Sequence, residues 1–266
     1  MVRIIAVANQ KGGVGKTTTT INLGTALAAT GERVLIVDLD PQGNASTGVG
    51  IDRKARIGST YDVIVGESTI ENTAVKTRVP GLSIVPSTLD LLGVEQAIAS
   101  TKDRAYRLRN ALRGDGVGAE DLGYTYVLID CPPSLNLLTI NALAASDAIL
   151  VPLQCEFFAL EGLSQLLQTV DHVRGTLNPE LEVHGIVLTM YDRRNSLANQ
   201  VVADVREHMG AKVYDTIIPR NVRVSEAPSF GKPALLYDVN CAGSRAYIEL
   251  ASEVIRREKR FKRKAA

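Results

Sequence analysis

The chain has 266 residues, of which 45% are hydrophobic and 22% charged, and its net charge is +1. A chain of this length and composition buries most of its surface in one sizeable core, which excludes a disordered or fibrous protein. The positive charge is local, because residues 256–266 hold seven Lys and Arg against one Glu and form a predicted basic tail.

Short β-branched runs alternate with helical patterns along the chain. We expect buried strands at residues 4–8, 34–38, 83–85, 126–130, 148–151, 183–189 and 213–217. We expect helices at residues 16–30, 91–112, 135–145, 162–177, 196–210 and 244–260, and a surface loop at 114–123. This alternation is typical of βαβ units. The sequence therefore predicts one α/β domain over residues 1–266, with a mainly parallel twisted sheet and helices on both faces.

A phosphate-binding loop is predicted between the first strand and the first helix, where the sequence reads KGGVGKTT. Glycines allow a tight turn that directs backbone N–H groups and a helix N-terminus at phosphate oxygens. Lys16 is expected to neutralise the phosphates of ATP, and the Thr17 hydroxyl to bind Mg²⁺. A turn that only joins strand to helix is the simpler alternative. The expected nucleotide-binding residues here are Lys11, Gly12, Gly13, Val14, Gly15, Lys16, Thr17 and Thr18.

The loop departs from the usual G-x-x-x-x-G-K-[ST] pattern, since Gln10 stands at the first glycine and Lys11 adds a second lysine. Two lysines near one triphosphate indicate more negative charge than one lysine balances. We expect Lys11 to reach the nucleotide of a facing subunit, so that the chain acts as a homodimer.

Carboxylates follow two other predicted strands. Because ligands bind beyond the carboxyl ends of parallel strands, Asp38, Asp40 and Asp130 are expected beside the phosphate loop. We expect Asp40 to orient the attacking water and Asp130 to hold Mg²⁺ directly or through water, as the Walker B carboxylate does. A helix cap or turn is the ordinary role of a single aspartate at a strand end.

Four segments together resemble the ParA-type chromosome- and plasmid-partitioning ATPases, which are relatives of MinD, ArsA and the nitrogenase iron protein. They are residues 11–18, 38–44, 128–134 and 218–229, spread over most of the chain. The resemblance implies a P-loop NTPase fold, with Lys11, Lys16 and Asp40 as catalytic residues and Thr17, Asp40 and Asp130 around Mg²⁺. It also implies that Pro219 and Asn221 contact the adenine end of ATP.

The same resemblance implies the functional cycle. ATP would close a sandwich dimer that binds double-stranded DNA without sequence preference, and a ParB-type centromere-binding protein would stimulate hydrolysis of ATP to ADP and phosphate, which releases the DNA. The implied location is the cytoplasm, on the nucleoid. The preferred DNA-binding pair, Arg194 and Arg223, matches arginines that the family uses for DNA. Further candidates are Arg193, Arg220, Lys232 and the basic tail.

Two other functions follow from related branches. A MinD-like positioning ATPase would use a C-terminal amphipathic helix on the membrane, but Phe261 alone among the basic residues offers too little apolar area for stable insertion. An iron protein would bridge a cluster with two cysteines from each subunit, and Cys131 lacks a convincing partner. The three widely spaced cysteines and the absence of a secretory pattern at the N-terminus favour a reducing, cytoplasmic protein.

Overall fold

The computed structural model describes residues 2–114 and 117–265, and within these ranges eight strands form one sheet in the order β3-β4-β2-β5-β1-β6-β7-β8. The strands are β1 (Arg3–Val7), β2 (Val34–Asp38), β3 (Val75–Lys76), β4 (Leu82–Val85), β5 (Tyr126–Asp130), β6 (Ala148–Gln154), β7 (Glu182–Tyr191) and β8 (Val213–Pro219). Every neighbouring pair is parallel except β3 and β4. The mainly parallel sheet predicted from the sequence is therefore confirmed.

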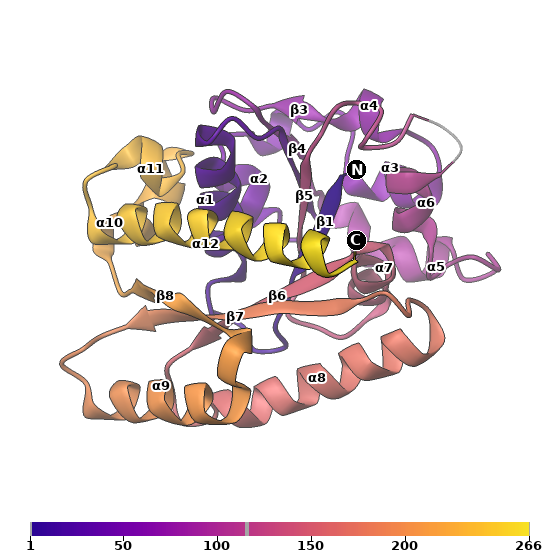
Figure 1. The fold of residues 1–266 in the computed structure, drawn as a ribbon. Coiled ribbons are helices and arrows are strands. Elements are labelled where there is room, and N and C mark those ends of the chain that lie inside the picture. The colour runs from indigo at the N-terminus through magenta and orange to yellow at the C-terminus, as the bar shows by residue number, and fades with distance from the viewer. Residues whose placement is uncertain (1, 115–116, 266) are drawn as a thin grey trace.

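Helices cover both faces of the sheet (Figure 1). They are α1 (Lys16–Ala29), α2 (Asn44–Gly48), α3 (Thr60–Val65), α4 (Ile70–Thr73), α5 (Val94–Ala97), α6 (Arg107–Arg113), α7 (Leu137–Ala145), α8 (Ala159–Thr176), α9 (Ser196–Met209), α10 (Val222–Glu226), α11 (Ala234–Tyr237) and α12 (Ala242–Ala265). Along β1, Ile4 and Ala6 pack into the core under α3 and α5 to α9, whereas Ile5 and Val7 pack into the core under α1 and α12. Burial on both faces explains why the strand runs are apolar without alternation.

The helix predicted at residues 91–112 is wrong. The chain there forms the 3₁₀ helix η2 (Leu89–Gly93) and α5, then turns, and becomes helical again only at α6. The Asn141 side chain explains the break, because it donates to the Arg104 carbonyl at 2.8 Å and accepts from the Leu108 N–H at 3.2 Å. Tertiary hydrogen bonds thus override local helix propensity.

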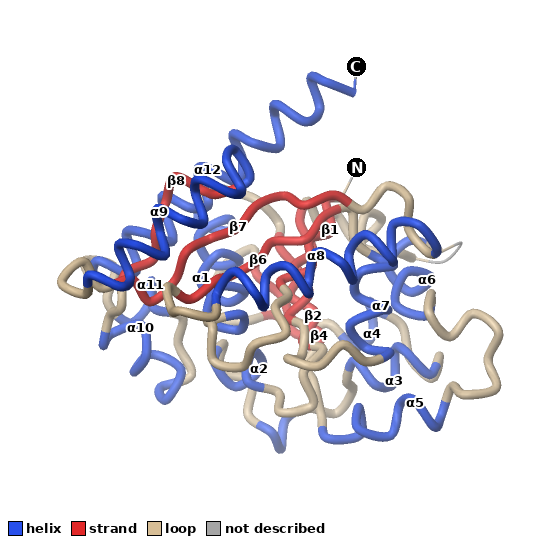
Figure 2. Tube along the Cα trace, turned by 90° about the horizontal axis from the view of Figure 1, so that it is seen from below, coloured by secondary structure: helices blue, strands red, loops and turns tan. Residues whose placement is uncertain are grey.

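Several short elements have no counterpart in the sequence prediction. They are β3 and the helices α2, α3, α4, α10 and α11, none longer than six residues. In the loop predicted at 114–123, residues 119–123 form turns, and residues 115–116 lie outside the described residues. The helix predicted at 244–260 is the longer α12, so residues 256–265 of the basic segment continue this helix, and only its C-terminal end projects from the body of the molecule (Figure 2).

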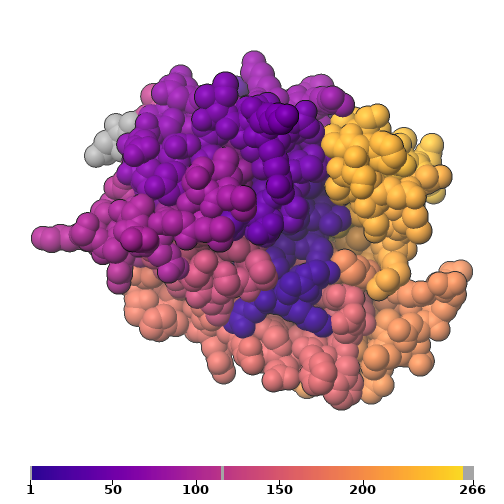
Figure 3. Space-filling model, turned by 180° about the vertical axis from the view of Figure 1, so that it is seen from behind, coloured from indigo at the N-terminus to yellow at the C-terminus, as the bar shows by residue number. Residues whose placement is uncertain are grey.

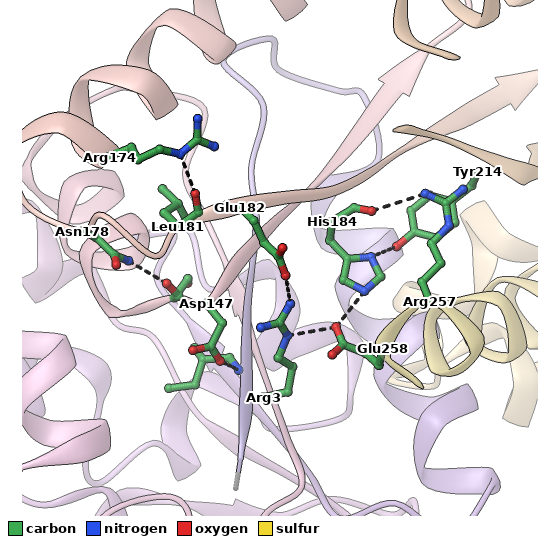
Figure 4. A network of polar contacts seen from close by, with 12 residues as sticks. Arg3, Asp147, Arg174, Asn178, Leu181, Glu182, His184, Tyr214, Arg257 and Glu258 are labelled. Carbon is green, nitrogen blue, oxygen red and sulfur yellow. Dashed lines mark hydrogen bonds and ion pairs between the residues drawn. The ribbon is translucent and has the colours of Figure 1, made fainter. Parts of the chain in front are cut away.

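The two ends of α12 contact opposite ends of the molecule. Near its start, the Tyr247 hydroxyl lies 3.3 Å from the Thr19 hydroxyl in α1, and both residues are buried. Near its end, Glu258 accepts from the Arg3 Nε at 2.9 Å and lies 2.8 Å from the His184 Nε2 (Figure 4). The helix therefore bridges α1 and the first residues of β1 and β7.

Arg257 fixes the same turn of α12 against β8. Its guanidinium lies 4.1 Å from the centre of the Tyr214 ring and donates to the Val213 carbonyl at 2.7 Å. The Tyr214 hydroxyl in turn contacts the His184 Nδ1 (Figure 4). Buried charged groups are retained only when they are paired and hydrogen-bonded, and this network meets that condition.

Glu258→Gln should destabilise the fold in a pH-dependent way. Burial raises the pKa of the Glu258 carboxyl, but hydrogen bonds and charge from His184 and Arg3 outweigh it, so the pKa lies below its ordinary value. This contribution is present above the unfolded pKa of about 4.5 and is lost as the pH falls through the lower folded pKa. We expect a loss of about 3 kcal/mol at pH 7, measured by denaturant unfolding.

The exposed Glu249→Gln, on the same helix, is the matched control and should change stability little. The difference between the wild-type protein and Glu258→Gln should shrink as the pH falls below about 4. A difference that stayed constant over this range would contradict the ion-pair explanation.

Candidate functional site

The phosphate loop lies at the centre of the carboxyl edge of the sheet. It follows β1, which is flanked by β5 on one side and β6 on the other. The chain first adds β2 to β5 on one side of β1 and then crosses to the other side to add β6, β7 and β8, so the strand order reverses at β1. Such a switch point is where α/β sheets bind ligands. Figure 3 shows the indigo N-terminal segment at the surface between the purple and salmon parts of the chain.

Two glycines of the loop adopt a backbone that other residues disfavour. Gly13 and Gly15 have φ angles of 75° and 90°. Gly15 is also the N-cap of α1 and provides no side-chain acceptor for the first N–H groups of the helix. These N–H groups need an acceptor, and the α1 dipole favours an anion there, so the loop fits a phosphate group.

Neighbouring strands hold the loop in this shape. The Asn9 side chain donates to the Pro152 carbonyl at 2.8 Å and accepts from the Lys11 N–H at 3.0 Å. The Thr189 hydroxyl, near the end of β7, donates to the Val14 carbonyl at 2.8 Å. Sequence reasoning missed Asn9 and Thr189, whose only signal is a polar residue near the end of a predicted strand.

The two loop lysines lie in different environments. Lys16 is buried, and its Nζ donates to the Lys11 carbonyl at 3.1 Å. Burial lowers the pKa of Lys16, although the charges of Asp130 and Asp40 oppose this effect. The Lys11 side chain is 40% exposed, and its Nζ lies 2.6 Å from the Glu156 Oε2. One lysine thus faces into the site and the other lies at its rim.

Asp38 and Asp130 lie side by side on β2 and β5, and both are fully buried. Burial, together with the charge of Asp38, raises the pKa of Asp130, while the nearby Thr17 hydroxyl and the Thr20 hydroxyl, which donates to the Asp130 Oδ1 at 3.1 Å, oppose the rise. The structure thus brings together Thr17 and Asp130, two of the residues expected at the metal. Their hydroxyl and carboxylate oxygens are hard ligands that fit Mg²⁺.

Asp38 and Asp40 differ in what they contact. Asp38 accepts from the Ser46 N–H at 2.8 Å and from its hydroxyl at 2.6 Å, so it fixes the start of α2. Burial raises the pKa of Asp38, against these hydrogen bonds. Asp40 is half-buried and accepts from the Gln42 N–H at 2.9 Å. Asp40 is therefore the more accessible of the two carboxylates.

The residues expected at the adenine end lie beyond β8. Pro219 is the last residue of β8 and pairs with Tyr191 of β7. The Asn221 side chain caps α10 by accepting from the Val224 N–H at 3.3 Å. Sequence reasoning assigned these two residues to the nucleotide, and the structure gives Asn221 this additional structural role.

The candidate DNA-binding arginines gather at one end of the sheet. Arg193 and Arg194 follow β7, and Arg220 and Arg223 follow the adjacent β8. The Arg220 N–H donates to the Tyr191 carbonyl at 2.9 Å, which joins the two loops. Lys232 is half-buried in the segment after η4 (Ala227–Phe230).

Both preferred arginines are exposed but have acidic neighbours. Arg194 is 85% exposed and contacts Asp192 through its Nε at 3.0 Å and its Nη2 at 2.8 Å. Arg223 is 55% exposed and lies 3.1 Å from Glu226. Exposed ion pairs are worth little, so both guanidinium groups remain accessible to phosphate.

Two observations bear on the alternative functions. Over the described ranges, no helix has the length and apolar character needed to cross a bilayer. Cys131 and Cys155 are buried free thiols, and burial raises the pKa of the Cys155 thiol to about 11. A thiol with a raised pKa is a weak metal ligand, which fits a packing role for Cys155.

Comparisons with known proteins point in one direction. A family model described as an AAA domain matches residues 2–183. The chromosome partitioning protein ParA of Caulobacter vibrioides (strain NA1000 / CB15N) is 64% identical over 100% of this chain and 98% of its own length. The sporulation initiation inhibitor protein Soj of Bacillus subtilis (strain 168) is 50% identical over 96% of this chain and 98% of its own.

Solved structures agree with this fold. Cobyrinic acid a,c-diamide synthase from Mycobacterium smegmatis, with bound ADP and magnesium, is 37% identical with a TM-score of 0.84, covering 97% of this chain and 96% of that one. The cell division ATPase MinD of Pyrococcus furiosus is 27% identical with a TM-score of 0.79, covering 96% and 99%. The P-loop NTPase fold expected from the sequence is thus confirmed.

Proposed function

Since this chain belongs to the ParA family of partitioning ATPases, we propose that it hydrolyses ATP with Mg²⁺ and that ATP closes a DNA-binding homodimer. The observation that carries this proposal is the division between its two loop lysines, one buried and one at the rim. Lys16 serves the nucleotide of its own subunit. Lys11 is accessible to the triphosphate of a second copy, so nucleotide binding and dimerisation depend on each other.

The hydrolysis site uses the residues around the loop. The N–H groups from Gly12 to Thr18 and the Lys16 ammonium bind the phosphates. Thr17 and Asp130 would hold Mg²⁺, which would supply positive charge beside the phosphates. Asp40, the accessible carboxylate near Lys16, orients the attacking water and contributes to the metal site. Pro219 and Asn221 contact the adenine end of ATP.

The DNA surface consists of the arginines after β7 and β8, with Lys232 beside them. Two copies double the number of phosphates that one complex neutralises, so only the dimer binds DNA strongly. A ParB-type partner accelerates hydrolysis and the dimer then leaves the DNA. This cycle fits a protein of the nucleoid that segregates DNA.

DNA binding measured in parallel with ATP, ADP and no nucleotide tests the proposed function. We expect strong binding to duplexes of unrelated sequence only with ATP, together with a dimer in gel filtration. Equal DNA affinity and the same monomer under all three conditions would refute the proposal.

Arg194→Ala or Arg223→Ala should weaken binding to all DNA sequences similarly. Each phosphate contact contributes about 1 to the slope of log affinity against log salt, and a dimer loses two contacts per substitution, so we expect the slope to fall by about 2. Arg109→Ala is the matched control, because Arg109 is an exposed arginine on α6 at the other end of the molecule. Unchanged salt dependence in both variants would indicate that the DNA-binding surface lies elsewhere on the molecule.

A further inference from the structure

The rim lysine is held by a carboxylate of its own chain. The Lys11 Nζ lies 2.6 Å from the Glu156 Oε2, although 145 residues separate the two in the sequence. The side chains are 40% and 48% exposed, so the contact lies at the surface of the site. Glu156 follows β6 by two residues and precedes α8, on the side of the loop opposite to Asp38 and Asp130.

The Glu156 carboxylate is fixed by its own turn. Its backbone N–H donates to the Gln154 carbonyl at 2.8 Å, and its Oε1 contacts the Gln154 Nε2. Its carbonyl accepts from the Ala159 N–H at 2.9 Å, where α8 begins. With one oxygen engaged by Gln154, the other is presented to Lys11.

Lys11 is also restrained through its backbone. Its N–H donates to Asn9 at 3.0 Å, and its carbonyl accepts from the Lys16 ammonium at 3.1 Å. Because Lys16 is the lysine proposed to bind the phosphates of its own subunit, this hydrogen bond links the backbone of Lys11 to the phosphate site. The contact with Glu156 determines where the free end of the Lys11 side chain lies.

We propose that Glu156 is a positioning residue that retains the Lys11 ammonium on its own subunit and thereby raises the ATP concentration at which two subunits close. This inference rests on the proposed cross-subunit role of Lys11. To reach a facing triphosphate, Lys11 leaves a carboxylate of its own chain and gains a phosphate of the other. Glu156 thus disfavours dimer closure unless the facing subunit carries a triphosphate that can replace it as the partner of Lys11.

The expected size of the effect follows from the exposure of the pair. A solvent-exposed ion pair that contributes measurably changes an equilibrium by about two- to fivefold. Closure of a symmetric dimer breaks two such pairs, so the two factors multiply. Removal of the Glu156 charge should therefore strengthen dimerisation by roughly 4- to 25-fold.

The experiment compares the full-length wild-type protein with Glu156→Gln by sedimentation velocity during a titration with ATPγS. Gln keeps the size of the side chain and removes its charge. We expect half-maximal dimer at a lower ATPγS concentration and a dimer constant tighter by roughly 4- to 25-fold. Glu161→Gln, which removes an exposed carboxylate from the first turn of α8, should behave as the wild-type protein.

The salt dependence of dimerisation distinguishes electrostatic retention of Lys11 from a purely structural effect of the Glu156→Gln substitution. Because an exposed pair is screened, the difference between Glu156→Gln and the wild-type protein should narrow as salt rises from 0.05 to about 0.5 M. Unchanged or weaker dimerisation of Glu156→Gln, while the wild-type protein dimerises with ATPγS, would overturn this inference alone. A wild-type protein that stays monomeric with ATPγS would instead refute the proposed function, and the inference with it.

Discussion

Asp40→Ala is expected to lower ATP hydrolysis by about a hundredfold or more while ATP binding persists. A carboxylate that orients or accepts a proton from the attacking water contributes on the order of 10²–10⁴ in rate. Nucleotide binding relies instead on the loop amides and Lys16. The measurements are phosphate release under saturating ATP and nucleotide affinity by titration.

The same variant should accumulate as the ATP-bound dimer and remain on DNA, because the step that ends the cycle is blocked. Asp52→Ala, a change on the surface outside the site, is the control and should turn over as the wild-type protein does. Undiminished phosphate release by Asp40→Ala would exclude Asp40 as the catalytic carboxylate.

Lys11→Ala should abolish ATP-dependent dimerisation and leave the monomer able to bind nucleotide. Hydrogen bonds to charged groups are worth about 1.5–3 kcal/mol, and a symmetric dimer loses two of them, so the dimer constant should weaken by at least about a hundredfold. Lys16→Ala, in contrast, should lose nucleotide binding itself. Sedimentation and nucleotide titration on both variants distinguish the two roles.

Lys54→Ala removes an exposed lysine of the 3₁₀ helix at Arg53–Ala55 and is the control for a general change of charge. It should dimerise with ATP as the wild-type protein does. If Lys11→Ala also dimerised normally, the second lysine of the loop would have no role between subunits, and nucleotide-gated closure would need another explanation.

The sequence predicted the sheet well because each strand is a short apolar run buried on both faces. The prediction for β2 and β5 matches the structure residue for residue, and the other five predicted strands differ only at their ends. The helix predicted over 91–112 was wrong because side chains distant in sequence, Asn141 above all, compete for its backbone groups. Short elements such as β3 and α4 carry too few residues to produce a periodic pattern.

For the site, the sequence predicted the loop and the carboxylates because each follows a recognisable strand. It did not predict the pairing of Lys11 with Glu156 or of Thr189 with Val14, which join residues 145 and 175 positions apart. Such pairings depend on the strand order, which places β6 and β7 beside β1. The catalytic, adenine-binding and DNA-binding assignments stay predictions that the variants above test.

The position of α12 has a practical consequence for shortened or tagged versions of this protein. The helix contacts the molecule from Thr19, the residue that directly follows the phosphate loop, to Arg3 at the start of the central strand. Deletion of its last turns would remove Arg257 and Glu258 and expose a buried edge of β7 and β8. Truncation at the basic segment would therefore impair folding and nucleotide binding together, and single charge substitutions are the better way to examine its contribution to DNA affinity.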